Sequence, residues 1–168
     1  ITVEESLQIM SSWETIMFDT ETSGRNPHIC KLLTAQFGTK DAQIVVDCTT
    51  INFKQYKEIL ETHLLVGHNL KFDCQFLYKY EIVPTKVWDT MIVEQLLHLG
   101  YNPKNIKYSL QAVAERRLDI YIDKTVRGEI IWRGIDESVI KYAAGDVVYL
   151  VDIMEQQIIQ PLLVKVYQ

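Results

Sequence analysis

The sequence has no apolar run long enough to span a membrane, and it has few cysteines. Cys30, Cys48 and Cys74 are odd in number and widely spaced, which argues against a disulfide framework or a zinc site. They indicate small buried thiols in a reduced, intracellular protein. The first ten residues, ITVEESLQIM, carry acids where a secretory signal carries bases. We therefore expect a cytoplasmic protein with no membrane partner.

Positive charge is also scarce. The chain has 17 Lys and Arg residues against 22 Asp and Glu residues, which gives a net charge of −5. This balance argues against binding long nucleic acid by bulk electrostatics, but it is compatible with a short substrate held locally by metal ions. With 168 residues, 48% of them apolar, we expect one globular domain over residues 1–168, with residues 1–12 as a lead-in. Because the chain does not begin with Met, we expect a domain excised from a longer protein or a processed chain.

Apolar patterning predicts an α/β fold. Strands are expected over residues 14–20, 31–39, 42–48, 64–69 and 86–90, and helices over residues 52–63, 70–80, 90–99, 108–117 and 136–158. The first three strands should form an antiparallel meander. The order of the elements predicts a mixed five-stranded sheet with helices on its faces.

The stretch IMFDTETSG, residues 16–24, places two acids where a buried strand ends. Residues two apart on a strand point to the same face, so Asp19 and Glu21 set two carboxylates side by side. Like charges this close repel, and the pair needs a proton or a cation. Active sites of such sheets collect at the carboxyl ends of the strands.

Two further polar clusters accompany this pair. In VGHNLKFDCQFL, Asn69 ends a strand and Asp73 follows in the first turn of a helix. In IKYAAGDVVYL, Tyr142 and Asp146 are four residues apart and share one helix face. Taken singly, the pair Asp19 and Glu21 is best interpreted as part of a solvated loop, and Asp73 as an acid that complements the helix dipole. Tyr142 is then a core tyrosine and Asp146 a surface acid. Together, four converging carboxylates predict two Mg²⁺ or Mn²⁺ ions, which in such sites lie about 3.5–4 Å apart and clamp a displacement at phosphorus.

These segments resemble the 3′–5′ exonuclease family whose site has three Asp and one Glu, in its tyrosine subtype. FDTET resembles the first motif of that family, GHNLKFD the second and YAAGD the third, while WDT at 88–90 and DKT at 123–125 resemble intervening segments. The match runs from Ile16 to Leu150 in the order and spacing of the family. The resemblance implies a ribonuclease H-like fold, in agreement with the strands expected above.

The resemblance also implies a role for each side chain. Asp19 bridges both metal ions. Glu21 and Asp146 complete the site of the ion that activates water, and Asp73 supports the second ion through water. Tyr142 orients the attacking water by its hydroxyl and is not the base, since a phenol with a pKa of about 10 stays protonated at neutral pH.

Substrate-binding residues follow from the same resemblance. Asn69 contacts the substrate strand, although a strand-ending Asn is an equally good interpretation. The main chain of Thr20 and Thr22 lies near the terminal nucleotide. Lys124 and Trp132 fall near the scissile end, with a core position as the alternative for Trp132. Arg25 stands where family members often carry an apolar wedge, so an Arg that stacks on the terminal base or reaches a phosphate is expected instead.

The resemblance implies hydrolysis of single-stranded or frayed 3′ DNA ends to 5′-mononucleotides, as in the proofreading domains of family A DNA polymerases. A polymerase domain in the parent chain is the partner implied. Thr22 favours this group, because ribonuclease D-like members tend to carry Phe there. The alternatives are a ribonuclease D-like 3′–5′ exoribonuclease and an inactive module that only binds nucleic acid.

Overall fold

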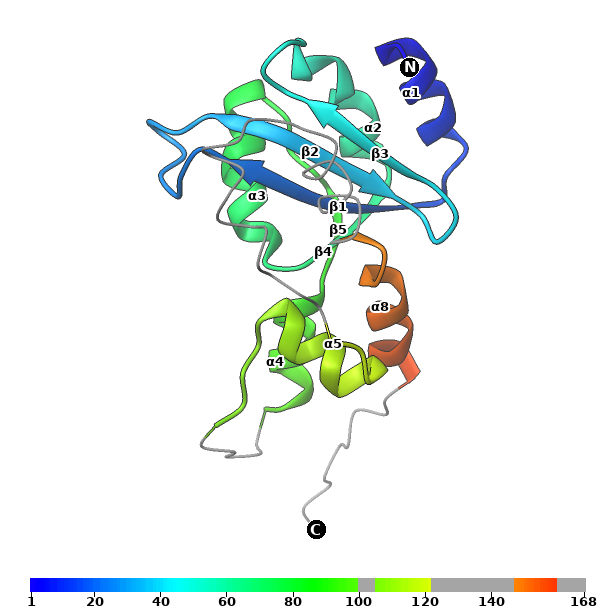
Figure 1. Cartoon of the computed structure of the whole chain (residues 1–168), viewed down its shortest axis with the longest axis vertical. Coiled ribbons are helices and arrows are strands. Elements are labelled where there is room, and N and C mark those ends of the chain that lie inside the picture. The colour runs from blue at the N-terminus through cyan, green and yellow to red at the C-terminus, as the bar shows by residue number, and fades with distance from the viewer. Residues whose placement is uncertain (100–104, 122–146, 160–168) are drawn as a thin grey trace.

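The central element of the fold is a five-stranded sheet with strand order β3-β2-β1-β4-β5 (Figure 1). The computed structural model describes residues 1–99, 105–121 and 147–159. The strands are β1 (Thr15–Thr22), β2 (Leu32–Gly38), β3 (Gln43–Asp47), β4 (Leu64–Gly67) and β5 (Lys86–Asp89). The helices are α1 (Val3–Ser11), α2 (Lys57–Thr62), α3 (Leu70–Leu77), α4 (Thr90–Leu97), α5 (Leu110–Leu118) and α8 (Leu150–Ile159), with short 3₁₀ helices η1 (Phe53–Tyr56) and η2 (Tyr78–Tyr80).

The topology confirms the predicted mixed sheet. β1 pairs with β2 and β2 with β3 in antiparallel fashion, so the first three strands form the expected meander. β4 and β5 run parallel to β1. The sheet is flanked by helices, and among the described residues no helix is long and apolar enough to cross a membrane.

The alternation of side chains along β1 divides the core in two. Ile16 and Phe18 point into the larger cluster, which is shared with α1, α2 and α3 and contains Phe18 stacked on Phe37 with ring centroids 5.5 Å apart. Met17 points to the other side and packs with Val66, Val147 and Leu150. The start of the C-terminal helical segment is therefore held against the same face of β1 that carries Asp19 and Glu21.

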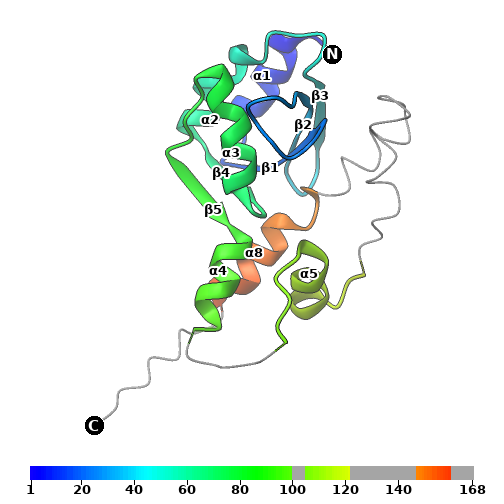
Figure 2. The ribbon, with the colours of Figure 1, turned by 90° about the vertical axis from the view of Figure 1, so that its left-hand side faces the viewer.

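A second group of helices lies beyond the end of β5 (Figure 2). α4, α5 and α8 are joined there by Glu94, whose side chain is 0% exposed and pairs with Arg116 Nη1 at 2.8 Å and Arg117 Nε at 2.9 Å. Gln157 of α8 donates to the Glu94 carboxylate at 3.0 Å. Burial by itself would raise the pKa of Glu94, but the hydrogen bonds from Arg117, Gln157 and Arg116 outweigh it and lower that pKa.

Several predicted boundaries were wrong. The helix expected over residues 52–63 divides into η1 and α2, and the one over 70–80 becomes α3 and then η2. β1 continues to Thr22, so Asp19 and Glu21 lie within the strand. The cysteines are free thiols as expected, but only Cys48 is buried, which raises its pKa to about 12. Of the helix expected over 136–158, the described part is α8.

Candidate active site

The carboxylates of the first motif lie where β1 loses one of its sheet neighbours. β4 pairs with β1 only from Thr15 to Met17, whereas β2 pairs with it as far as Thr22. Among the described residues, the last half of β1 thus has a sheet partner on one side only. The pairing with β2 also shifts register between Glu21 and Thr22. Such irregularities bend a strand and re-aim its side chains, and they are common beside active sites.

The strand next to this edge carries buried polar side chains. Gln36 lies directly opposite Asp19, and Thr34 directly opposite Glu21, and both are fully buried. Directly opposed residues share a face of the sheet, so the two carboxylates face an amide and a hydroxyl. Gln36 Nε2 donates to Thr34 Oγ1 at 2.5 Å, while Gln36 Oε1 has no hydrogen-bond partner within the part of the chain that the structure describes. This face of the sheet supplies mainly oxygen atoms.

The second motif approaches the same edge through an unusual helix start. Asn69 precedes α3 in the left-handed conformation, with φ 65° and ψ 42°, and its side chain makes no capping hydrogen bond. A left-handed non-glycine residue costs free energy, of order 1–3 kcal/mol in strained cases, and such residues cluster at functional sites. The amide side chain of Asn69 is exposed and contributes to the pocket described below.

Asp89 takes over the capping of α3. Its Oδ1 accepts from the Asn69 amide at 3.0 Å, and its Oδ2 accepts from the Leu70 amide at 2.8 Å. The same carboxylate caps α4 by accepting from the Met91 and Ile92 amides at 2.9 and 3.3 Å. One buried side chain thus fixes the first turns of two helices. The Asn69 side chain is therefore not needed as the cap of α3.

Asp73 is joined directly to the first motif. Thr20 Oγ1 donates to Asp73 Oδ1 at 2.5 Å, and both side chains are almost fully buried, with Asp73 2% exposed. Burial, followed by the negative charges of Asp73 and Asp89, raises the pKa of the neighbouring Cys74 thiol to about 11. The start of α3 is therefore a region of concentrated negative charge.

A pocket of about 680 Å³ opens at this junction. It is lined by residues of β1, of the loop after it and of the start of α3, namely Thr20, Glu21, Thr22, Gly24, Arg25, Asn69 and Phe72. The loop is folded back tightly, because a Cβ on Gly24 would lie 2.7 Å from Cys30 Sγ. The pocket combines a carboxylate, a guanidinium, an amide and an aromatic ring, which suits a ligand carrying both phosphate and a base.

The structure therefore brings together the parts of the first and second motifs that the sequence placed in one site. Glu21, Asn69 and Arg25 line the pocket with Thr20 and Thr22, and Asp73 bonds to Thr20. Asp19 shares the face of β1 that carries Met17 and Glu21. The predicted residues Lys124, Trp132, Tyr142 and Asp146 lie outside the described residues.

Sequence reasoning missed the function of the WDT segment. Trp88 Nε1 donates to Gln157 Oε1 of α8 at 3.0 Å, Asp89 caps α3 and α4, and Thr90 Oγ1 donates to the Gly67 carbonyl at 3.1 Å. Three consecutive side chains thus connect the second motif with the C-terminal helix. The signal available in the sequence was an Asp followed by the apolar helix TMIVEQLL, which is an N-cap pattern.

The described side chains do not complete a metal site alone. Within residues 1–99, 105–121 and 147–159, no group of three or more His, Cys, Asp and Glu side chains is placed to hold a metal ion. The chemistry of the donor set nevertheless fits a hard cation, because the polar side chains around the first motif offer carboxylate, amide and hydroxyl oxygens.

Comparisons with known proteins identify a family for this chain. A family model described as 3′–5′ exonuclease matches residues 2–162. DNA polymerase I of Aquifex aeolicus is 29% identical over 151 residues, which are 88% of this chain and 24% of that protein. The chain thus spans about a quarter of the length of that relative.

Solved nucleases share the fold. Brucella melitensis NrnC with bound Mg²⁺ superposes with a TM-score of 0.73 at 22% identity, covering 87% of this chain and 72% of that one. Escherichia coli RNase D, an exoribonuclease involved in structured RNA processing, gives a TM-score of 0.76 at 20% identity, covering 92% and 41%. At these identities the similarity concerns the fold.

Proposed function

The chain belongs to the 3′–5′ exonuclease family, and on this premise we propose that it is a metal-dependent exonuclease that shortens single-stranded or frayed DNA from the 3′ end. The observation that carries the proposal is the Thr20–Asp73 hydrogen bond beside the pocket lined by Glu21 and Asn69. It joins residues of two motifs that lie 53 residues apart in the chain. We take residues 1–168 as a single exonuclease domain.

The carboxylates provide the sites for the cations. Asp19, Glu21, Asp73 and Asp146 would hold two Mg²⁺ or Mn²⁺ ions, which when bound lower the pKa of the attacking water and stabilise charge on the leaving 3′ oxygen. The role proposed for Asp146 has indirect support, because Val147, next to it in the sequence, packs on Met17. Met17 is two residues before Asp19 on the same face of β1.

Other side chains bind and orient the reactants. Tyr142 orients the water, which attacks the terminal phosphorus as the bond to the 3′ oxygen breaks and a 5′-mononucleotide leaves. The backbone of Thr20 and Thr22 and the Asn69 amide hold the terminal nucleotide in the pocket. Arg25 pairs with a phosphate or stacks on the base, and Lys124 and Trp132 lie near the scissile end.

A DNA substrate is the finer part of the proposal. It is supported by the DNA polymerase I relative and by Thr22, and it makes a polymerase domain the expected partner in the parent protein. The second candidate, an exoribonuclease activity, is favoured by the fold shared with RNase D. An inactive nucleic-acid-binding module is disfavoured because the acids and the tyrosine of all three motifs are present in the sequence.

The deciding experiment compares DNA and RNA oligonucleotides of the same sequence and length, labelled at the 5′ end, under identical Mg²⁺. DNA should shorten stepwise from its 3′ end, and RNA should shorten more slowly because the 2′-hydroxyl distinguishes the two. A 3′-phosphate should block both. Equal rates on RNA and DNA would replace the proofreading proposal with the ribonuclease D-like function. If neither substrate is shortened, the result favours the inactive nucleic-acid-binding module.

A further inference from the structure

We propose that a second hollow, beside the second half of α3, binds an upstream nucleotide of the single-stranded substrate and stacks its base on Tyr78. The hollow has a volume of about 480 Å³ and is lined by Pro27, His28, Gln75, Tyr78 and Lys79. None of these residues has a role in the chemistry proposed above. The inference rests on the exonuclease function and extends it to the path of the strand.

The hollow continues the catalytic pocket along the same two walls. Gly24 and Arg25 line the catalytic pocket, and Pro27 and His28, next in the same loop, line the hollow. On α3 the corresponding residues are Phe72 and Gln75, which are three apart and so share one helix face. From Phe72 to Tyr78 the helix axis advances by about 9 Å at 1.5 Å per residue. A strand leaving the pocket along α3 therefore reaches the hollow directly.

The loop is fastened to the helix along this path. Lys79 Nζ donates to the Cys30 carbonyl at 2.7 Å, so the end of the loop is tied to η2, which directly follows α3. The Ser23 amide donates to the Lys31 carbonyl at 2.9 Å, which closes the base of the loop. Figures 1 and 2 show this loop beside α3 in both views. The loop is thus closed at its base and tied to the helical wall through Lys79, so the hollow is a built feature of the surface.

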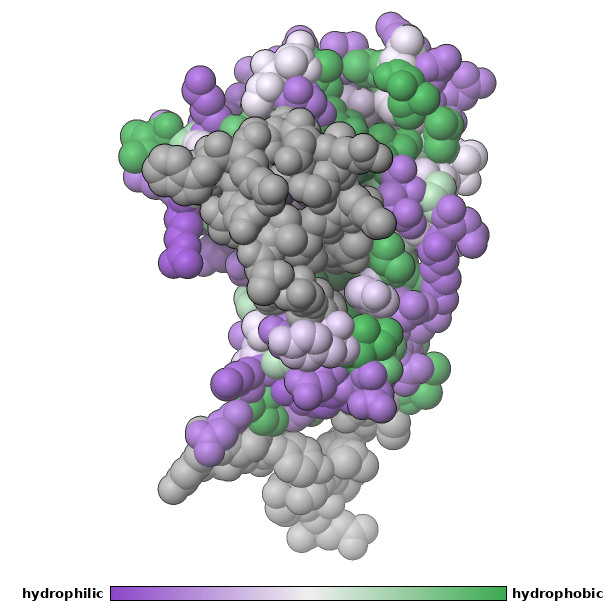
Figure 3. All heavy atoms as spheres, in the orientation of Figure 1, coloured by the Kyte–Doolittle hydropathy of each residue, from purple (hydrophilic) through white to green (hydrophobic). Residues whose placement is uncertain are grey.

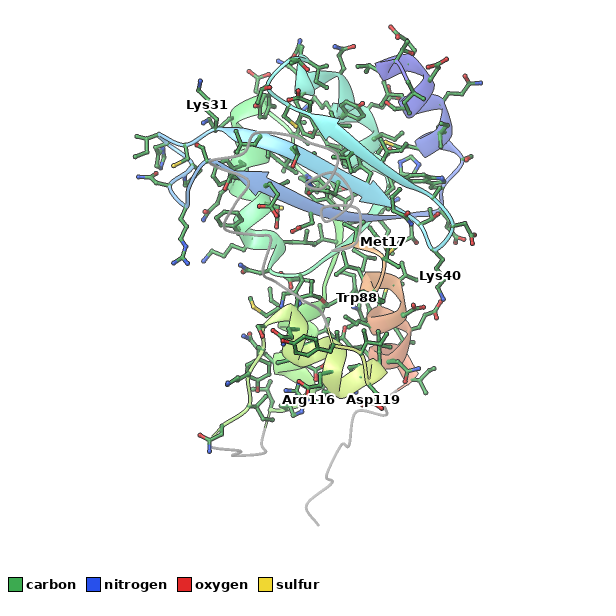
Figure 4. All side chains as sticks on the ribbon, in the orientation of Figure 1. Met17, Lys31, Lys40, Trp88, Arg116 and Asp119 are labelled. Carbon is green, nitrogen blue, oxygen red and sulfur yellow. The ribbon has the colours of Figure 1, made fainter. Side chains whose placement is uncertain are left out.

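The charge around the hollow suits a phosphodiester strand. Residues 22–31 contain Arg25 and Lys31 and no acid, although acids outnumber bases in the chain as a whole. Lys31 projects from this end of the sheet (Figure 4), and α3 and η2 add Lys71 and Lys79. In the space-filling view, hydrophilic side chains lie on either side of a hydrophobic tip at this edge (Figure 3). Proteins that bind single-stranded nucleic acid commonly hold its backbone in a groove lined with positive charges.

Tyr78 supplies the stacking surface. Its side chain is 61% exposed, although a large aromatic ring is usually at least half buried, and it stands beside the exposed imidazole of His28. Base–aromatic stacking is worth about 1–3 kcal/mol per base and does not depend on sequence. An exposed ring in a basic groove next to the catalytic pocket is therefore suited to an upstream base of either DNA or RNA.

The test compares substrates that reach the hollow with one that cannot. The p-nitrophenyl ester of thymidine 5′-monophosphate holds one nucleotide and reports on the catalytic pocket alone. Oligodeoxynucleotides of two to eight nucleotides extend progressively along α3. For Tyr78→Ala, kcat/KM on the octanucleotide should fall roughly tenfold, mainly through KM, because one stacking contact is lost. Hydrolysis of the ester should remain unchanged.

Two control variants separate stacking from a structural effect. Tyr78→Phe keeps the ring and should retain the rate on long substrates. Tyr121→Ala removes another exposed tyrosine, 75% exposed, and should change neither rate. The proposal is overturned if Tyr78→Ala leaves the octanucleotide rate unchanged, or if it slows the ester and the octanucleotide equally. Failure of the exonuclease function gives a different result, in which the unmodified protein cleaves neither substrate.

Discussion

Thr20 and Asp73 are joined by a buried hydrogen bond, Thr20 Oγ1 to Asp73 Oδ1 at 2.5 Å, that links β1 to α3. This contact fixes the position of the first motif relative to the second. The donor also orients the Asp73 carboxylate. Hydrogen bonds of this kind to a ligating carboxylate set its orientation and its affinity for metal.

The first prediction therefore concerns Thr20. Thr20→Val keeps the shape of the side chain and removes the donor, so the Mg²⁺ concentration for half-maximal activity should rise about 10- to 100-fold. Thr20→Ser keeps the hydroxyl and should stay near the unmodified protein. The measurement is a Mg²⁺ titration of single-stranded DNA cleavage. Equal Mg²⁺ dependence in the Val and Ser variants would show that this hydrogen bond does not orient a metal ligand.

The second prediction concerns the double cap. Asp89→Ala removes acceptors from four backbone amides at two helix ends, so the free energy of unfolding should fall by roughly 2–4 kcal/mol, at about 1–2 kcal/mol per lost cap. Ser109→Ala is the matched control, since Ser109 caps only α5, through one bond of 3.4 Å. It should cost about 1 kcal/mol or less. Urea denaturation measures both, and equal losses would contradict the double role of Asp89.

The third prediction concerns the close packing of β4 on β1. A Cβ on Gly67 would lie 2.3 Å from Leu70 Cδ2 and 2.8 Å from the Phe18 carbonyl oxygen, and the backbone atom cannot move aside. Gly67→Ala should cost about 1–3 kcal/mol and slow cleavage, because it pushes the start of α3 away from β1. A Cβ on Gly38 would meet only side-chain carbons closer than 3.5 Å, at 3.2 and 3.4 Å, so Gly38→Ala should be milder. The same loss in both variants would argue against this steric account.

The fourth prediction concerns pH. The pKa of Glu94 is lowered in the folded protein, so its ionised form contributes stability that is fully present above its unfolded value, 4.5, and is lost as pH falls through the folded pKa. The free energy of unfolding should therefore decrease as pH is lowered below about 4.5. In Glu94→Gln this decrease should be smaller, and stability at pH 7 should be about 3 kcal/mol lower, because Arg116 and Arg117 lose the carboxylate charge that they share. Parallel pH profiles for the two proteins would contradict the assignment.

The sequence predicted the sheet and the two described motifs because both depend on local patterns. Apolar runs ending in FDTET and VGHN place strands, and carboxylates at strand ends and early helical turns place a site. The capping by Asp89 could not be predicted in full, because a local N-cap pattern says nothing of a second helix that lies 20 residues earlier in the chain. The same holds for Gln36 and Thr34, whose position opposite the acids depends on strand register. The hollow at Tyr78 depends on how the loop folds against α3, which no pattern in the sequence encodes.

The most direct test of the account is cleavage of a 5′-labelled single-stranded oligonucleotide by the unmodified protein and by Asp19→Asn, with a chelator and then with added Mg²⁺. The account predicts stepwise shortening from the 3′ end that stops with the chelator and returns with Mg²⁺. In Asp19→Asn the rate should fall by several orders of magnitude while the circular dichroism spectrum stays the same. Its melting temperature without metal should rise, since repulsion between Asp19 and Glu21 is removed. Robust cleavage by Asp19→Asn, or cleavage by the unmodified protein in the presence of the chelator, would contradict the carboxylate-bound metal site on which the account depends.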